Sequence, residues 1–138
     1  MQATFTPMSR DHRKLRVFHD AHELVLAVYR HTNQFPKDEW FGLRLQLRRT
    51  AVSVPANIIE GNARRTTKDY CNFLHIALAS ACEVSYLVVL SGGLGYFDAT
   101  ASKQLRAHSE RVVRQLQALT DEMERRLLTE REPHDRRP

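Results

Sequence analysis

The sequence predicts an all-α protein, folded as an antiparallel up-down-up-down bundle of four helices. Apolar residues recur at three- and four-residue spacing through four long segments, which is the period of one helix face. The chain has 138 residues but only five glycines and five prolines, too few turn-formers for a many-stranded sheet. We therefore expect one bundle domain at residues 14–128, between a disordered N-terminal arm (1–13) and a disordered C-terminal tail (129–138).

The first and fourth helices each carry a single apolar stripe. The first runs from Leu15 and ends before Pro36, because the residue that precedes a proline is pushed out of the helical conformation. Its stripe holds Val17, Phe18, Ala21, Leu24, Val25, Val28 and Tyr29. The fourth opens at Asp98 or Thr100, and its stripe holds Leu105, Val112, Leu116, Leu119, Met123 and Leu127. One stripe per helix predicts one solvent-facing side.

The second helix, expected from about Trp40 to Asn62, carries two apolar stripes. At about 100° per residue, one face holds Leu43, Leu47, Ala51, Val54 and Ile58. A second strip on nearly the opposite side holds Leu45, Val52, Ala56 and Ile59. The polar strip between them holds Gln46, Arg49, Ser53, Asn57, Glu60 and Arg64. Two stripes predict a helix packed on both sides, within its own subunit and against another, so we expect a homo-oligomer.

The third helix is expected to start at a cap formed by Thr66 or Thr67 and to be the most buried of the four. Residues 84–90 are apolar almost all round, and Gly92 and Gly93 mark the end of the helix. The uncharged stretch from Val84 to Phe97 is shorter than the ~20 apolar residues that span a bilayer, so we expect no membrane contact.

The cysteines and the N-terminal residues favour a cytoplasmic protein. Cys71 and Cys82 would lie roughly 16 Å apart along one helix, too far for a disulfide. Two unpartnered thiols suit a reducing compartment. The first twenty residues contain no apolar run of the kind found in a signal peptide.

Enzyme chemistry is not indicated, and we predict no cofactor, no metal site and no catalytic residue. His19, His22 and Glu23 lie close in sequence, but no HExxH or CxxC motif accompanies them, which favours solvated histidines. Gly92, Gly93 and Gly95 follow a predicted helix rather than a strand, so a dinucleotide-binding loop is excluded. An enzyme that uses the Ser53–Glu60 polar strip is retained only as a minor alternative.

Pro55 stands inside the second helix, where it removes a hydrogen bond at a cost of ~3 kcal/mol or more. Two interpretations stay open: a kink that lets the helix bend round a partner, or a kink and polar strip that shape an interface or site. Glu83 is expected to pair with Arg48, Arg49 or Arg64, since a buried carboxylate needs a partner. The predicted structural or interface residues are Leu45, Val52, Ser53, Pro55, Asn57, Ile59, Glu60 and Glu83.

Positive charge is concentrated in the first half of the chain. Residues 1–68 hold twelve lysines and arginines against six acids, whereas residues 69–138 hold nine against ten. Arginine binds phosphate well through its bidentate fork. The candidate nucleic-acid-binding residues are Arg44, Arg48, Arg49, Arg64, Arg65 and Lys68. No stacking aromatics are interleaved with them, so we expect salt-sensitive contacts to the backbone of RNA or DNA.

Four short motifs stand out in the sequence: S-x-P-x-N-I-x-E-G at residues 53–61, Phe35-Pro36, Q-L-R-R at residues 46–49, and Ser80-x-x-Glu83. With these motifs, residues 15–97 resemble the small four-helix-bundle proteins of the 23S rRNA intervening-sequence family. That family includes the accessory variability determinants of diversity-generating retroelements. This chain departs from the common pattern at Leu45, Thr50 and Ile59, and at Asn62-Ala63, where a glycine-rich pair is usual.

The resemblance implies a ring-like homopentamer. In the retroelement members it also implies a basic surface that engages RNA or DNA and a reverse transcriptase. On the charges and the resemblance together, we expect a non-enzymatic accessory protein that binds nucleic acid. The alternative is a protein–protein interaction scaffold whose arginines serve subunit contacts and touch no nucleic acid.

Overall fold

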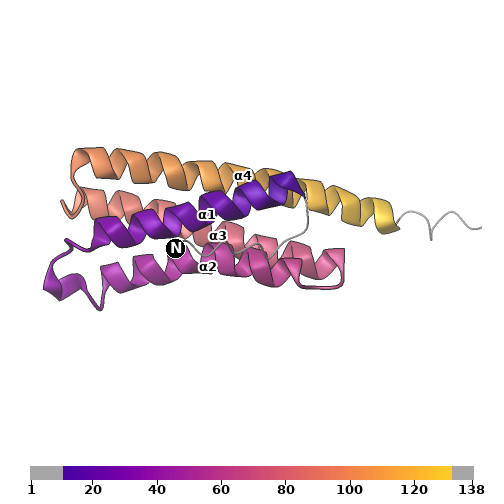
Figure 1. Ribbon diagram of the computed structural model, residues 1–138, viewed down its shortest axis with the longest axis horizontal. Coiled ribbons are helices and arrows are strands. Elements are labelled where there is room, and N and C mark those ends of the chain that lie inside the picture. The colour runs from indigo at the N-terminus through magenta and orange to yellow at the C-terminus, as the bar shows by residue number, and fades with distance from the viewer. Residues whose placement is uncertain (1–10, 132–138) are drawn as a thin grey trace, which may run out of the picture.

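The structure, a computed structural model that describes residues 11–131, is the expected four-helix bundle (Figure 1). The helices are α1 (His12–Thr32), α2 (Leu43–Asn62), α3 (Thr67–Gly93) and α4 (Ala99–Arg131), and a short 3-10 helix, η1 (Lys37–Glu39), precedes α2. Each helix packs against the next in sequence, and α4 also packs against α1, which closes the bundle. The α2–α3 turn lies at the same end as the start of α1 and the last turns of α4 (Figure 1).

The helix ends follow local capping, and two helices are longer than expected. Asp11 accepts a hydrogen bond from the backbone nitrogen of Arg13 at 3.0 Å, so α1 begins at His12 rather than Leu15. At the other end of the chain α4 continues to Arg131, and Glu130 accepts a hydrogen bond from the Thr67 hydroxyl at 3.0 Å. The rest of the predicted arm and tail, residues 1–10 and 132–138, lies outside the described residues.

Side-chain caps also start α3 and α4. The Thr66 hydroxyl accepts from the Asp69 backbone nitrogen at 3.1 Å, and Asp98 accepts from the Ala101 backbone nitrogen at 2.7 Å. Each cap is one of the two candidates that the sequence offered, Thr66 or Thr67 for α3 and Asp98 or Thr100 for α4. The start of α2 differs: non-helical backbone angles at Gly42 (φ −104°, ψ −111°) delay it to Leu43 instead of Trp40.

The core lies where the apolar stripes of the four helices meet. Its largest fully buried side chains include Leu24, Leu47, Ile58, Leu74, Leu105 and Leu116. Burial of one such leucine or isoleucine contributes about 1.5–3 kcal/mol. The predicted core face of α2 is buried throughout, whereas no residue of its second strip (Leu45, Val52, Ala56, Ile59) is buried within the chain. Within the single subunit, one apolar stripe of α2 is therefore buried and the other is at least partly exposed.

The prediction that α3 is the most buried helix is wrong for the solvent-facing side of this helix. It packs between α2 and α4, but Ile76, Tyr86 and Val89 are 48%, 62% and 48% exposed. By length and composition α3 is also apolar enough to cross a membrane, which the shorter stretch from Val84 to Phe97 did not indicate. Core helices of bundles pass the same test, and α3 makes its contacts here with α2 and α4.

Gly61 allows the last turn of α2 to approach α3 closely. A Cβ atom at this position would lie 2.8 Å from the Cβ of Phe73 and 3.0 Å from Cδ2 of Tyr70. No side chain fits there without displacing α3. Further along α3, Cys71 is buried and Cys82 is exposed, and both thiols are free, as expected.

Candidate nucleic-acid interface

The six candidate cations fall into two groups at opposite ends of α2. The N-terminal group is Arg44, Arg48 and Arg49, and the turn group is Arg64, Arg65 and Lys68 around the α2–α3 turn. From Arg48 to Arg64 the chain rises about 24 Å along the helix axis.

Arg48 is a structural residue that ties α2 to the end of α1. Its Nε donates to the hydroxyl of Thr32 at 2.8 Å, and its Nη2 donates to the carbonyl of Tyr29 at 3.3 Å and to Oδ1 of Asn33 at 3.1 Å. The guanidinium also lies 4.5 Å from the centroid of the Tyr29 ring. Of the six cations, Arg48 is therefore the least available to an external phosphate.

The other two members of the N-terminal group are more open. The Arg44 guanidinium lies over the Trp40 ring, 4.4 Å from its centroid. Desolvation and the neighbouring Arg48 lower the pKa of Arg44 from its usual value, yet the guanidinium of an arginine stays charged at neutral pH. Arg49 is exposed and makes no hydrogen bond, ion pair or ring contact with the residues that the structure describes.

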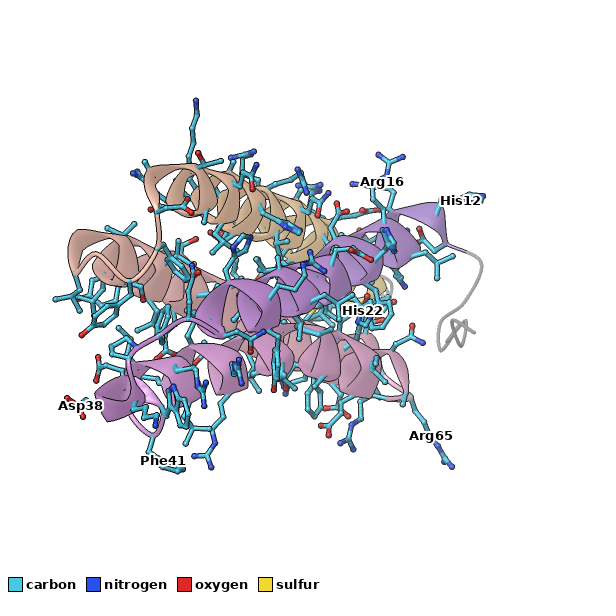
Figure 2. All side chains as sticks on the ribbon, turned by 60° about the vertical axis from the view of Figure 1, so that its left-hand side comes forward. His12, Arg16, His22, Asp38, Phe41 and Arg65 are labelled. Atoms are coloured by element: carbon cyan, nitrogen blue, oxygen red, sulfur yellow. The ribbon has the colours of Figure 1, made fainter. Side chains whose placement is uncertain are left out.

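The turn group is the most exposed set of cations on α2 and its flanks. Arg64 stacks on Phe73, with its guanidinium carbon 4.7 Å from the ring centroid. Arg65 and Lys68 make no hydrogen bond, ion pair or ring contact with the residues that the structure describes. Figure 2 shows Arg65 extending away from the turn, at the opposite end of the bundle from Phe41.

None of the six cations forms an ion pair with an acidic side chain among residues 11–131. The ion pairs in this range join Arg13 to Glu122, His75 to Glu124, Arg111 to Asp20, and Arg126 to Glu122. All of these pairs involve α4. The cations on α2 and its turn are therefore left without an ion-pair partner among the described residues.

The expected pairing of Glu83 with Arg48, Arg49 or Arg64 is wrong for the single chain. Glu83 is exposed and accepts a hydrogen bond from Nε2 of Gln46 at 3.2 Å. Arg48 instead binds the end of α1, and Arg64 instead covers Phe73. The apolar sequence around Glu83 suggested burial, but the residue lies on the outer side of α3, where a carboxylate stays hydrated.

The polar strip of α2 forms a seam with α3. The hydroxyls of Ser53 and Ser80 lie 2.9 Å apart. Nδ2 of Asn57 donates to the Ser53 carbonyl at 2.7 Å and to its hydroxyl at 3.0 Å. Pro55 is buried and Glu60 is exposed. The Ser53 and Asn57 side chains are thus engaged inside the subunit, and no group of histidine, cysteine and acidic residues able to hold a metal occurs in the described chain.

Apolar side chains are exposed or half-buried on the solvent sides of α2 and α3, and we call this set of residues the outer apolar face. Its members are Leu45, Val52, Ala56 and Ile59 on α2, together with Ile76 and Tyr86 on α3. Val52 is 42% exposed, Ile76 48% and Tyr86 62%. The sequence predicted the α2 half from its second stripe. It did not predict the α3 half, because a helix that is apolar almost all round does not show from its sequence which side faces solvent.

Sequence reasoning also missed three residues that meet the turn group in space. Lys14 of α1 lies over the ring of Tyr70, with its Nζ 4.7 Å from the centroid. Lys14, Tyr70 and Arg126 line the same surface cavity as Arg64 and Arg65. Lys14 and Arg126 are more than 45 residues from the turn in sequence, so only the fold brings them there.

Comparison with known proteins supports the fold and the family. A similar solved structure is the 1.70 Å crystal structure of a protein with unknown function from the S23 ribosomal protein family of Bacteroides thetaiotaomicron. The match has a TM-score of 0.73 and 21% sequence identity, and it covers 79% of this chain and 98% of that chain. An identity this low shows a shared fold. No curated protein matches the chain.

The sequence pattern of the family described as 23S rRNA-intervening sequence protein matches residues 13–118. This range takes in nearly all of α1, all of α2 and α3, and more than half of α4. It confirms the resemblance carried by the motif at residues 53–61. The chain belongs to the 23S rRNA-intervening sequence protein family.

Proposed function

We propose that this protein is a non-enzymatic homo-oligomer that binds the backbone of RNA or DNA as an accessory protein, with a reverse transcriptase as a candidate enzyme partner. The observation that carries the proposal is that the cations of α2 and the α2–α3 turn form no ion pair among the described residues. Arg49, Arg65 and Lys68 are exposed and meet no described acidic side chain. Unpaired cations of this kind attract phosphate through a counterion-release effect that depends on salt.

The spacing of the two groups suits a strand that runs along α2. A distance of about 24 Å corresponds to roughly seven nucleotide steps at 3.4 Å per step. A nucleic acid lying parallel to the helix would meet Arg65 and Lys68 at one end and Arg49 with Arg44 at the other. Few contacts per subunit predict weak binding by a single chain. Several copies in one oligomer would add their contacts and raise the overall affinity.

The outer apolar face supports the oligomer. Exposed apolar residues on two adjacent helices mark surfaces that another protein covers. The second stripe of α2 belongs to this face, so a neighbouring subunit is the occupant that we propose, and the family resemblance favours a pentamer. The two free thiols, Cys71 and Cys82, support a reducing cytoplasm as the compartment.

Titration with single-stranded RNA and duplex DNA at two salt concentrations tests the proposal. The intact protein should bind at low salt and lose affinity as salt rises. The double variant Arg65→Gln/Lys68→Gln should reduce the slope of log affinity against log salt by about 0.7–0.9 for each contact removed. The matched control is Lys103→Gln/Arg106→Gln, which removes the same charge at the same spacing from the exposed side of α4. Absence of binding at low salt, or equal effects of both double variants, would contradict the proposal.

A protein–protein scaffold is the second candidate, and two observations favour it. Arg48 serves an internal contact rather than a free surface, and the outer apolar face is suited to proteins rather than to phosphate. A scaffold would keep its oligomeric mass and bind neither RNA nor DNA at low salt. The same titration therefore separates the two functions.

A further inference from the structure

A small basic cavity lies at the end of the bundle that carries the α2–α3 turn. Its volume is about 230 Å³. Four of its lining side chains are cationic: Lys14 from α1, Arg64 and Arg65 from the turn, and Arg126 from α4. No carboxylate of the described residues 11–131 lines it. Positive side chains from α1, from the α2–α3 turn and from α4 thus line the same cavity.

The first turn of α3 also faces this cavity. Thr66 and Thr67 are among the lining residues, and the helix that starts here is 27 residues long. The first backbone N–H groups of a helix have no partner within the helix, and together with the helix dipole they favour an anion. The Thr66 hydroxyl caps the Asp69 nitrogen, which leaves the preceding backbone donors of the turn without a capping side chain.

Tyr70 gives an independent indication of a ligand. Its side chain lines the cavity and only 6% of the residue is exposed, yet its hydroxyl has no hydrogen-bond partner among the described residues. A buried polar group left unsatisfied costs about 1–3 kcal/mol. Burial raises the pKa of Tyr70 far above its usual value, so the phenol keeps its proton and is a hydrogen-bond donor at neutral pH. The donor lacks an acceptor.

Arg126 retains free donors in spite of its ion pair. Its Nη2 lies 3.2 Å from Oε1 of Glu122, but the other oxygen of this carboxylate lies 2.7 Å from Nη1 of Arg13. Glu122 is thus shared between two arginines. An arginine has five N–H donors, and a single contact to a shared carboxylate leaves most of them available.

We propose that this cavity binds a phosphate monoester and, resting on the proposed function, that it holds the phosphorylated end of a nucleic-acid strand. A terminal phosphate carries about 1.5–2 negative charges and three acceptor oxygens. A diester within a strand carries a single charge and two free oxygens. The cavity is smaller than the roughly 300–1,000 Å³ of sites that enclose drug-sized ligands. It suits a phosphate group with the rest of the strand outside, along the turn group.

Binding of inorganic phosphate tests the cavity itself. Calorimetric titration should show binding to the intact protein, and Tyr70→Phe and Arg126→Gln should each weaken it by roughly tenfold or more. The matched control is Arg125→Gln, the adjacent exposed arginine, which does not line the cavity and should leave phosphate affinity unchanged. Without phosphate, Tyr70→Phe should unfold at the same temperature as the intact protein or higher, because it removes an unsatisfied buried hydroxyl. No phosphate binding, or equal weakening by Arg125→Gln, would overturn the proposed cavity site.

Oligonucleotides with different ends test the strand-end assignment. One sequence is compared with a 5′-phosphate, with a 3′-phosphate and with no terminal phosphate. At least one phosphorylated form should bind more tightly than the unmodified strand, and Tyr70→Phe should abolish that preference. Equal affinity for all three would overturn the assignment to a strand end. The salt-sensitive binding that all three share is the separate test of the proposed function, so the two can fail independently.

Discussion

The α1–α4 side and the α2–α3 side of the bundle differ in their ion pairs: Arg13–Glu122 and Arg111–Asp20 join α1 to α4, whereas none joins α2 to α3 among the described residues. Where α1 meets α4, Asp20 accepts a hydrogen bond from Nε2 of Gln115 at 2.7 Å and lies 3.7 Å from Nε of Arg111. Glu122 lies between Arg13 and Arg126. These two carboxylates of the α1–α4 side therefore meet partners within the chain.

On the α2–α3 side, side-chain hydrogen bonds join the two helices along the seam, whereas the exposed arginines and the turn group form no ion pair with a described residue. Ser53 meets Ser80 and Gln46 meets Glu83, but the exposed Arg49 and the turn group have no described counter-charge. The outer apolar face lies on the same side. Exposed apolar residues and unpaired cations that have no partner within one chain are available to a second molecule. We therefore propose that self-association and phosphate binding use α2, α3 and their turn.

The largest effect is expected from a charge in the outer apolar face. Val52→Glu should dissociate the oligomer, because a carboxylate buried between subunits without a partner costs several kcal/mol. The control is Leu26→Glu on α1, since Val52 and Leu26 are 42% and 39% exposed. Light scattering measures the mass of each protein. The intact protein and Leu26→Glu should both have a mass that is a multiple of the 16.0 kDa chain, about 80 kDa for a pentamer, whereas Val52→Glu should have the mass of one chain.

Two results would contradict this assignment. A monomeric mass for the intact protein would show that it does not self-associate. Dissociation of Leu26→Glu alone would show that the interface between subunits lies on α1. Both substitutions should leave the fold of the single chain in place, because changes at partly exposed positions typically alter the free energy of unfolding by less than about 0.5 kcal/mol. Circular dichroism checks this point.

A smaller effect is expected where α2 approaches α3. Gly61→Ala should lower the free energy of unfolding by about 1–3 kcal/mol, because the added methyl group would meet the Cβ of Phe73 at 2.8 Å. Gly93→Ala, at the other end of α3, is the control, since nothing lies within 4 Å of its added methyl group. Denaturant titration compares the two. Equal stability of both variants would mean that the close approach at Gly61 is not a constraint.

Much of the fold could be predicted from helical periodicity, because a local pattern decides which face of a helix is buried. The stripes of α1 and α4, the core face of α2, and the caps at Thr66 and Asp98 all follow from neighbouring residues. The exposed side of α3 could not be predicted in this way. Its sequence is apolar all round, and only the positions of α2 and α4 determine that Tyr86 points outward.

The candidate site was predicted less completely, for the same reason. Side chains on one helix can be placed from sequence, but partners across helices cannot. Glu83 was assigned to an arginine and instead meets Gln46, while Arg48 turns to Thr32 of α1. The basic cavity depends on Lys14 and Arg126, which join the turn group only after four helices have packed.

The smallest and most discriminating effect separates two neighbouring arginines. Arg48→Gln should lower the free energy of unfolding by about 1–2 kcal/mol, because three hydrogen bonds to the end of α1 are lost. Arg49→Gln should leave stability unchanged, since Arg49 makes no hydrogen bond, ion pair or ring contact with a described residue, but it should reduce the salt slope of nucleic-acid binding by about 0.7–0.9. Both variants remove one charge from adjacent positions, so long-range electrostatics cannot explain a difference. If Arg48→Gln reduced the salt slope as much as Arg49→Gln without loss of stability, Arg48 would belong to the binding surface and its contacts with α1 would be incidental.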